Sequence, residues 1–126
     1  MALAEVLVVD DDVDLAEAVR DVLVADGRFD VRIAHDGAEA LAAIEGKLPD
    51  IILLDMRMPV MNGWEFTRIF RERYDHLAPL IAFTAAESVE QRAHEVGAEG
   101  YVPKPFELRQ LFTELERHVG DGAESA

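Results

Sequence analysis

The sequence predicts an α/β fold in which one five-stranded parallel sheet carries helices on both faces. Three observations predict it. Short apolar runs alternate with segments of helical periodicity five times along the 126 residues. Three of these runs are apolar throughout, as strands buried on both faces of a parallel sheet are. The length suits a single domain, and half of the residues are hydrophobic, which excludes general disorder.

The strands differ in how their apolar residues are arranged. The first, third and fourth are the continuous runs Val6–Val9, Ile51–Leu54 and Leu80–Phe83. The second, Phe29–Ala34, alternates apolar with polar residues, and the fifth is the short pair Tyr101–Val102. The second and fifth patterns are typical of edge strands. With short connections and right-handed crossovers, this predicts a doubly wound sheet of order 2-1-3-4-5, the flavodoxin-like (βα)5 arrangement.

Each strand is followed by a helix whose apolar residues recur every three or four positions and so share one face. In chain order these residues are Leu15, Val19, Val22 and Leu23; Leu41 and Ile44; Phe66, Ile69 and Phe70; Val89, Ala93 and Val96; and Leu108, Leu111, Phe112 and Leu115. Asp36 with Glu39 three residues later has capping-box spacing, which predicts the start of the second helix. Gly27, Gly46 and Gly97 predict helix ends.

Composition narrows the possible settings and partners. We expect one domain over residues 1–119 and a frayed polar tail at 120–126. The absence of cysteine excludes disulfides and thiolate metal sites. No apolar run could span a bilayer and no secretory signal is visible, so we expect a cytoplasmic protein without a membrane partner. The net charge of −14 would be repelled by phosphate backbones, so no direct nucleic-acid binding is expected.

Chemically reactive residues stand where the predicted strands end. Asp10 and Asp11 follow the first strand, Asp55 follows the third, Thr84 ends the fourth, and Lys104 follows the fifth. In a doubly wound sheet, ligands bind beyond the carboxyl ends of the strands, where the strand order reverses. That point lies between the first and third strands. We therefore expect the three acids to converge there, with Thr84 and Lys104 beside them.

This combination of groups suits phosphoryl transfer. Carboxylates held close together repel one another, so that one protonates or a cation binds. Mg²⁺ is the natural cation, because it prefers oxygen ligands and keeps positions for water or phosphate oxygens. Lys104 adds a positive charge and Thr84 a hydroxyl donor. A carboxylate in such surroundings can attack a phosphoryl group and form an aspartyl phosphate, because the developing charge is neutralised.

Four segments resemble the signature segments of response-regulator receiver domains, the CheY-like family of two-component signalling. They are VLVVDDD, LLDMRMPVMNGWE, FTA and GYVPKPF, in the family's order, and the resemblance covers about residues 5–119. It implies Mg²⁺-dependent phosphoryl transfer from the phosphohistidine of a sensor histidine kinase or a histidine phosphotransfer protein. It also implies a switch that catalyses only its own phosphorylation and dephosphorylation, and is otherwise not an enzyme.

The resemblance implies a role for each acid. Asp55 would be the phosphoacceptor. Asp11 and Asp55 would bind Mg²⁺ through their side chains and Arg57 through its backbone carbonyl. Asp10 would act on the metal mainly through a bound water. In the same family, the identity of residue 57 tunes how fast the phosphate is lost.

The resemblance also implies how the phosphoryl group is held and sensed. Thr84 would donate a hydrogen bond to it, Lys104 would pair with it, and Ala85 would leave room for it. Tyr101 would be the switch aromatic that swings inward as Thr84 moves, unless it is simply an edge-strand aromatic. The peptide bond between Lys104 and Pro105 is expected to be cis.

The expected output is protein binding through the face made by the fourth helix, the fifth strand and the fifth helix. Related regulators with winged-helix DNA-binding output often dimerise there through charged pairs, typically with two acids before the switch aromatic. Here that stretch reads Glu99–Gly100, so one acid is missing. We therefore expect a monomer or weak dimer, either a stand-alone regulator or a receiver module, that binds a downstream protein target.

Two alternatives remain at this stage. Asp10-Asp11-Asp12-Val13 also fits the D-x-D-x-[TV] motif of haloacid-dehalogenase-like phosphatases, with Asp10 as nucleophile and Asp12 as general acid. That interpretation leaves Asp55 unexplained, and no cap domain or later acidic pair is visible. A pseudo-receiver is the second alternative, but such modules usually lack an acid, the Thr or the Lys. We interpret Asp12 as a helix cap and Trp64 as a packing residue.

Overall fold

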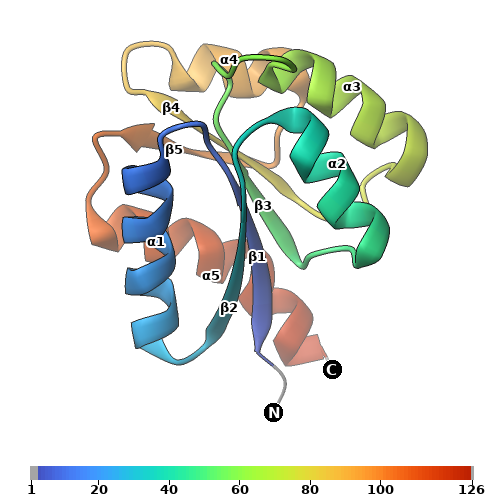
Figure 1. Ribbon diagram of the computed structural model, residues 1–126. Helices are drawn as coiled ribbons and strands as arrows, with labels where there is room; N and C mark the ends of the chain where they lie inside the picture. Colours follow the sequence, from blue (N-terminus) through green and yellow to red (C-terminus); the bar gives the residue numbers. More distant parts are fainter. Residues whose placement is uncertain (1–2, 126) are drawn as a thin grey trace.

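The computed structural model describes residues 3–125, with side chains described as far as His118. One parallel sheet has the order β2-β1-β3-β4-β5, which confirms the order predicted from the edge-like strands (Figure 1). The strands are β1 Ala4–Val9, β2 Phe29–Ala34, β3 Ile51–Leu54, β4 Leu80–Ala85 and β5 Gly100–Lys104. The helices are α1 Val13–Asp26, α2 Gly37–Gly46, α3 Gly63–Tyr74, α4 Val89–Val96 and α5 Leu108–Ser125.

The sheet is buried between two layers of helices. Helices α1 and α5 cover one face, and α2, α3 and α4 cover the other (Figure 1). Along β1, Val6 and Val8 pack toward α1 and α5, whereas Leu7 and Val9 pack toward α2 and α3. All four side chains are fully buried. Burial on both faces is the reason that the central strands are continuous apolar runs.

Side-chain caps fix where the first two helices begin. Asp12 caps α1, and its carboxylate accepts the backbone N–H of Leu15 at 3.1 Å, which confirms its interpretation as a cap. Asp36 caps α2 by accepting the N–H of Glu39 at 2.8 Å. The Glu39 carboxylate in turn accepts the N–H of His35 at 3.0 Å, one residue before the cap. The predicted capping box therefore closes on the residue that precedes Asp36.

Glycines end two of the helices as predicted. Gly27 after α1 and Gly97 after α4 adopt φ values of +91° and +65°, the left-handed region that favours glycine. Gly46 is the last residue of α2, and the extended residue Lys47 caps that helix. The expected tail at 120–126 overlaps the end of α5, whose side chains beyond His118 lie outside the described part, so its fraying stays a prediction.

No helix in the described part of the chain combines the length and the apolar composition that crossing a membrane requires.

Candidate functional site

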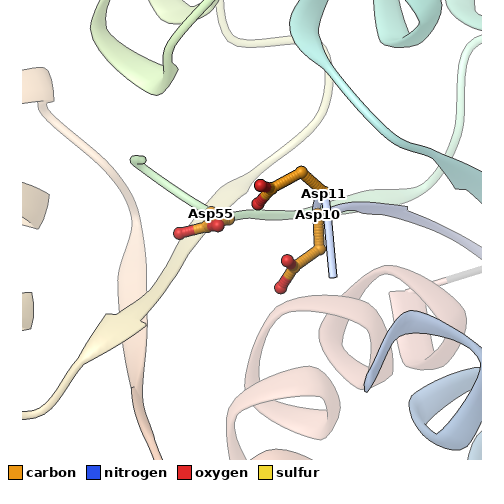
Figure 2. Close-up of side chains that lie close together, drawn as sticks. All are labelled: Asp10, Asp11 and Asp55. Carbon is orange, nitrogen blue, oxygen red and sulfur yellow. The ribbon is translucent and has the colours of Figure 1, made fainter. Parts of the chain in front are cut away.

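Three carboxylates converge at the carboxyl edge of the sheet. Asp10 and Asp11 follow β1 directly, and Asp55 follows β3, the neighbouring strand (Figure 2). Each offers an oxygen, and these oxygens lie within 4.8 Å of one another. Asp10 is fully buried, Asp55 is 5% exposed, and Asp11 is open to solvent. The position is the reversal point of the strand order, as the sequence predicted.

Backbone hydrogen bonds orient the two buried carboxylates. The N–H of Asp55 donates to the carbonyl of Val9 at 2.9 Å, which joins the ends of β3 and β1. The N–H of Arg57 donates to Oδ1 of Asp55 at 3.2 Å, and the N–H of Asp12 donates to Oδ1 of Asp10 at 2.9 Å. Each carboxylate therefore keeps its other oxygen, Oδ2, for a further partner.

Lys104 brings a positive charge to these oxygens from the far side of β4. Its Nζ lies 2.6 Å from Oδ2 of Asp10 and 3.7 Å from Oδ2 of Asp55. The ammonium also lies 4.9 Å from the ring centroid of Phe83, a cation–π distance. The peptide bond between Lys104 and Pro105 is cis, which confirms the prediction.

The remaining predicted residues lie along β4 and β5. Thr84 is buried near the end of β4, and the next residue, Ala85, pairs in register with Lys104. The hydroxyl-bearing residue thus stands on the same sheet edge as the acids. Tyr101 is 40% exposed and points away from the core at the outer edge of β5. It lines two surface grooves, one between β5 and α4 and one between β5 and α5.

Burial has the largest effect on the pKa of the phosphoacceptor candidate, Asp55. Burial raises the pKa of Asp55, and its neighbours Asp10 and Asp11 raise it further, while Lys104 lowers it. The result is a pKa of about 6 in place of the usual 3.8. The cluster sets one ammonium against three carboxylates, and the Lys104 ammonium does not offset the effect of burial on Asp55.

The donor set fits a hard divalent cation. The cluster offers carboxylate oxygens on buried and exposed sides, and Mg²⁺ takes one or two carboxylates and keeps water or phosphate oxygens for its other positions. Asp11 offers its carboxylate on the solvent-facing side of the cluster. The charge deficit and the oxygen-only chemistry both suit this ion.

The phosphatase alternative is not supported. It requires Asp10 as nucleophile, yet both oxygens of this carboxylate are engaged, Oδ1 by the N–H of Asp12 and Oδ2 by the ammonium of Lys104 at 2.6 Å. It also requires Asp12 as general acid, yet its carboxylate is engaged as the cap of α1 through Leu15. Asp55, which that interpretation leaves without a role, lies inside the cluster.

Phe83 and Trp64 make contacts that the sequence did not predict. Phe83 lies under the Lys104 ammonium. Its position directly before Thr84 is the only feature of the sequence that pointed to a place near the site. Trp64 was expected only to pack. It also donates from Nε1 to Glu95 at 3.1 Å and stacks under the guanidinium of Arg92 at 5.1 Å, which ties α3 to α4.

Comparison with known proteins agrees with this geometry. A family model, the response regulator receiver domain, matches residues 6–116. The chain therefore belongs to the response regulator receiver domain family of two-component signalling, which confirms the resemblance seen in its four segments.

Curated relatives include the response regulator MprA of Mycobacterium avium, 41% identical over 112 residues that make up 87% of this chain and 48% of that protein. The chain thus spans about half the length of the curated relatives it matches. Among solved structures, the chemotaxis protein CheY4 of Vibrio cholerae is 36% identical with a TM-score of 0.81, over 93% of this chain and 99% of that one. The receiver domain of the Francisella response regulator 1452 is 29% identical with a TM-score of 0.84, over 94% and 98%.

Proposed function

We propose that this receiver domain accepts a phosphoryl group on Asp55 from the phosphohistidine of a sensor histidine kinase or a histidine phosphotransfer protein, in a Mg²⁺-dependent reaction. One observation carries the proposal: a buried carboxylate, Asp55, lies within 4.8 Å of two further acids and 3.7 Å from the ammonium of Lys104. Such surroundings suit a nucleophile that must meet a highly charged phosphoryl group.

The metal would be held by this chain's own oxygens. Asp11 and Asp55 would bind it through their side chains, Arg57 through its backbone carbonyl, and Asp10 through a water. Bound there, Mg²⁺ would neutralise charge on the phosphoryl oxygens. The oxygens of Asp10 and Asp55 are already fixed by backbone donors, so little reorganisation is needed when the cation enters.

Transfer is a single substitution at phosphorus. An oxygen of ionised Asp55 forms the new bond to phosphorus while the P–N bond of the donor breaks. The electron pair of that bond returns to the imidazole nitrogen, which takes up a proton from solvent. Lys104 pairs with the transferred group, the Thr84 hydroxyl donates to it, and Ala85 leaves it room. Hydrolysis by water later returns the carboxylate and releases inorganic phosphate.

The output is a change at the face of α4, β5 and α5. Movement of Thr84 toward the phosphoryl group would leave space into which Tyr101, now exposed on β5, can turn. The two grooves beside Tyr101 would change shape together. We propose a downstream protein as the partner of this face, in a cytoplasmic setting, without membrane or nucleic-acid contact by the domain, whose net charge is −14.

Phosphorylation can be tested directly by mass spectrometry. Incubation with acetyl phosphate and Mg²⁺ should add one phosphoryl group to the wild-type protein, and EDTA should abolish the reaction. Asp55→Asn should block the addition, because the nucleophile is lost. Asp14→Asn, on the exposed first turn of α1, is the matched control and should be modified like the wild type. Equal modification of Asp55→Asn would refute the assignment.

A further inference from the structure

The loop that follows Asp55, residues 56–62, is fastened to its surroundings close to both ends. At one end the N–H of Gly63 donates to the carbonyl of Met56 at 3.1 Å. At the other end the N–H of Gly37, the first residue of α2, donates to the carbonyl of Met61 at 3.3 Å. Arg57 lies between these two fastenings. The direction of its carbonyl therefore depends on where both fastenings hold the loop.

The loop contains a strained backbone conformation that the surrounding structure has to stabilise. Val60 has a φ of +68°, and the N–H of Met61 donates to the carbonyl of Pro59 at 2.7 Å, which makes a γ-turn centred on Val60. A β-branched residue is disfavoured in this region of φ. The Val60 side chain is 82% exposed, so its own burial does not offset the strain. The surrounding structure must therefore hold the turn closed.

The contact best placed to hold it is between Met61 and Gly37. A Cβ on Gly37 would lie 2.8 Å from both Cγ and Sδ of Met61 and 3.0 Å from its Cβ, closer than packed atoms come. The Met61 side chain thus lies directly on the bare Cα of Gly37, which is buried. Gly37 does not belong to the residues with positive φ, so its backbone conformation does not require glycine. Close approach of Met61 is what requires it.

We propose that Gly37 is a positioning residue for the metal site, which it influences through Met61 and the strained turn at Val60. By letting Met61 approach α2 closely, it holds the loop in the form from which the Arg57 carbonyl would bind the metal. This inference rests on the proposed function, in which that carbonyl is a ligand. Mg²⁺ demands near-ideal octahedral geometry, so a small displacement of one ligand weakens binding.

The test is the affinity for Mg²⁺ alone, measured by isothermal titration calorimetry without phosphodonor. Gly37→Ala should push Met61 away and weaken Mg²⁺ binding by about tenfold, the usual effect of disturbing a residue that orients a ligand. Thermal unfolding in EDTA reports separately whether the metal-free fold is intact. Met61→Ala removes the same contact from the other side and should also weaken binding, which gives a second variant if Gly37→Ala does not fold.

A matched control and a rescue separate positioning from helix stability. Gly46→Ala lies at the other end of α2, where an added Cβ meets nothing within 4 Å, and should leave the Mg²⁺ affinity unchanged. The double variant Gly37→Ala/Met61→Ala should recover most of the lost affinity relative to Gly37→Ala, because the new methyl group occupies space that the Met61 side chain vacated. A purely structural effect on α2 would persist in the double variant.

The outcomes distinguish this inference from the proposed function. Wild-type protein that binds no Mg²⁺ and takes no phosphoryl group would overturn both. Wild-type binding with an unchanged affinity in Gly37→Ala would overturn only the positioning role. Loss of affinity in Gly37→Ala without recovery in the double variant would also overturn it, because the effect would not pass through Met61.

Discussion

Asp55 carries an electrostatic cost in the unphosphorylated protein. Burial and two neighbouring acids raise its pKa to about 6. At neutral pH the carboxylate is therefore ionised in surroundings that favour its protonated form. The folded pKa lies above the ordinary value of 3.8, and ionisation at neutral pH therefore lowers the free energy of unfolding. A bound cation would relieve this cost, so the proposed metal site and the instability of the metal-free protein have one cause.

Replacing this carboxylate by a neutral group should stabilise the fold. In EDTA at pH 7, Asp55→Asn should raise the free energy of unfolding by roughly 1–3 kcal/mol, because the amide carries no charge that must be buried. The gain should be full above pH 6 and should shrink as the pH falls from about 6 toward 3.8, where the wild-type carboxyl becomes protonated in the folded state. Urea unfolding across this range measures it. A gain that grows on acidification would show that the buried charge is not its cause.

At the scale of elements, the residue before β5 ties three segments together. Glu99 accepts hydrogen bonds from Nη2 of Arg71 on α3 at 3.1 and 3.0 Å and from the N–H of Leu80, the first residue of β4, at 2.6 Å. Nδ1 of His76 lies 3.2 Å from the same carboxylate. Burial acts to raise the pKa of Glu99, but the hydrogen bonds from Leu80 and Arg71 outweigh it, so the pKa is lowered overall.

This junction should give a stability contribution that depends on pH. Because the folded pKa lies below the ordinary value of 4.5, the stabilisation is full above pH 4.5 and is lost as the pH falls through the folded pKa. At pH 7, Glu99→Gln should lower the free energy of unfolding by about 2 kcal/mol, the scale of charge-assisted hydrogen bonds. Its difference from the wild type should narrow below pH 4.5. Glu90→Gln, an exposed residue on α4, is the control and should be nearly neutral.

At the scale of the whole molecule, the face of α4, β5 and α5 combines the exposed Tyr101 with an acid that is paired within the chain. Glu99, the acid two residues before Tyr101, is paired within the chain to Arg71. The next residue is Gly100, where an added Cβ would collide with the carboxylate of Glu114 on α5. An acid in place of Gly100 would therefore require the end of the Glu114 side chain to move, and Glu99 is already engaged by Arg71.

Activation should therefore not produce a tight dimer through this face. With beryllofluoride and Mg²⁺, light scattering over a concentration series should give a monomer or a weak dimer, because one of the two acids that such dimers typically carry before the switch aromatic is missing. Asp55→Asn under the same conditions should match the untreated protein. A tight symmetric dimer across α4 and α5 would overturn this expectation and would indicate output through paired regulators.

The sequence by itself determined the fold class, the strand order and which acids converge at the sheet edge. Periodicity reports burial, and burial on both faces distinguishes central strands from edges, so order 2-1-3-4-5 could be read from apolar runs. Because parallel strands end at one edge, residues placed after Val9 and Leu54 had to meet there. The cap at Asp12 was also readable, since its cause is local.

Tertiary structure alone decided how the cluster is charged and held. The raised pKa of Asp55 depends on its depth and on distances to Asp10 and Lys104, which no spacing along the chain encodes. The contact of Met61 with Gly37 joins residues 24 positions apart, and its significance lies in a fit of atoms. Sequence patterns record what each position buries. Which atoms come into contact depends on how the helices and the sheet pack against one another, and this is seen only in the three-dimensional structure.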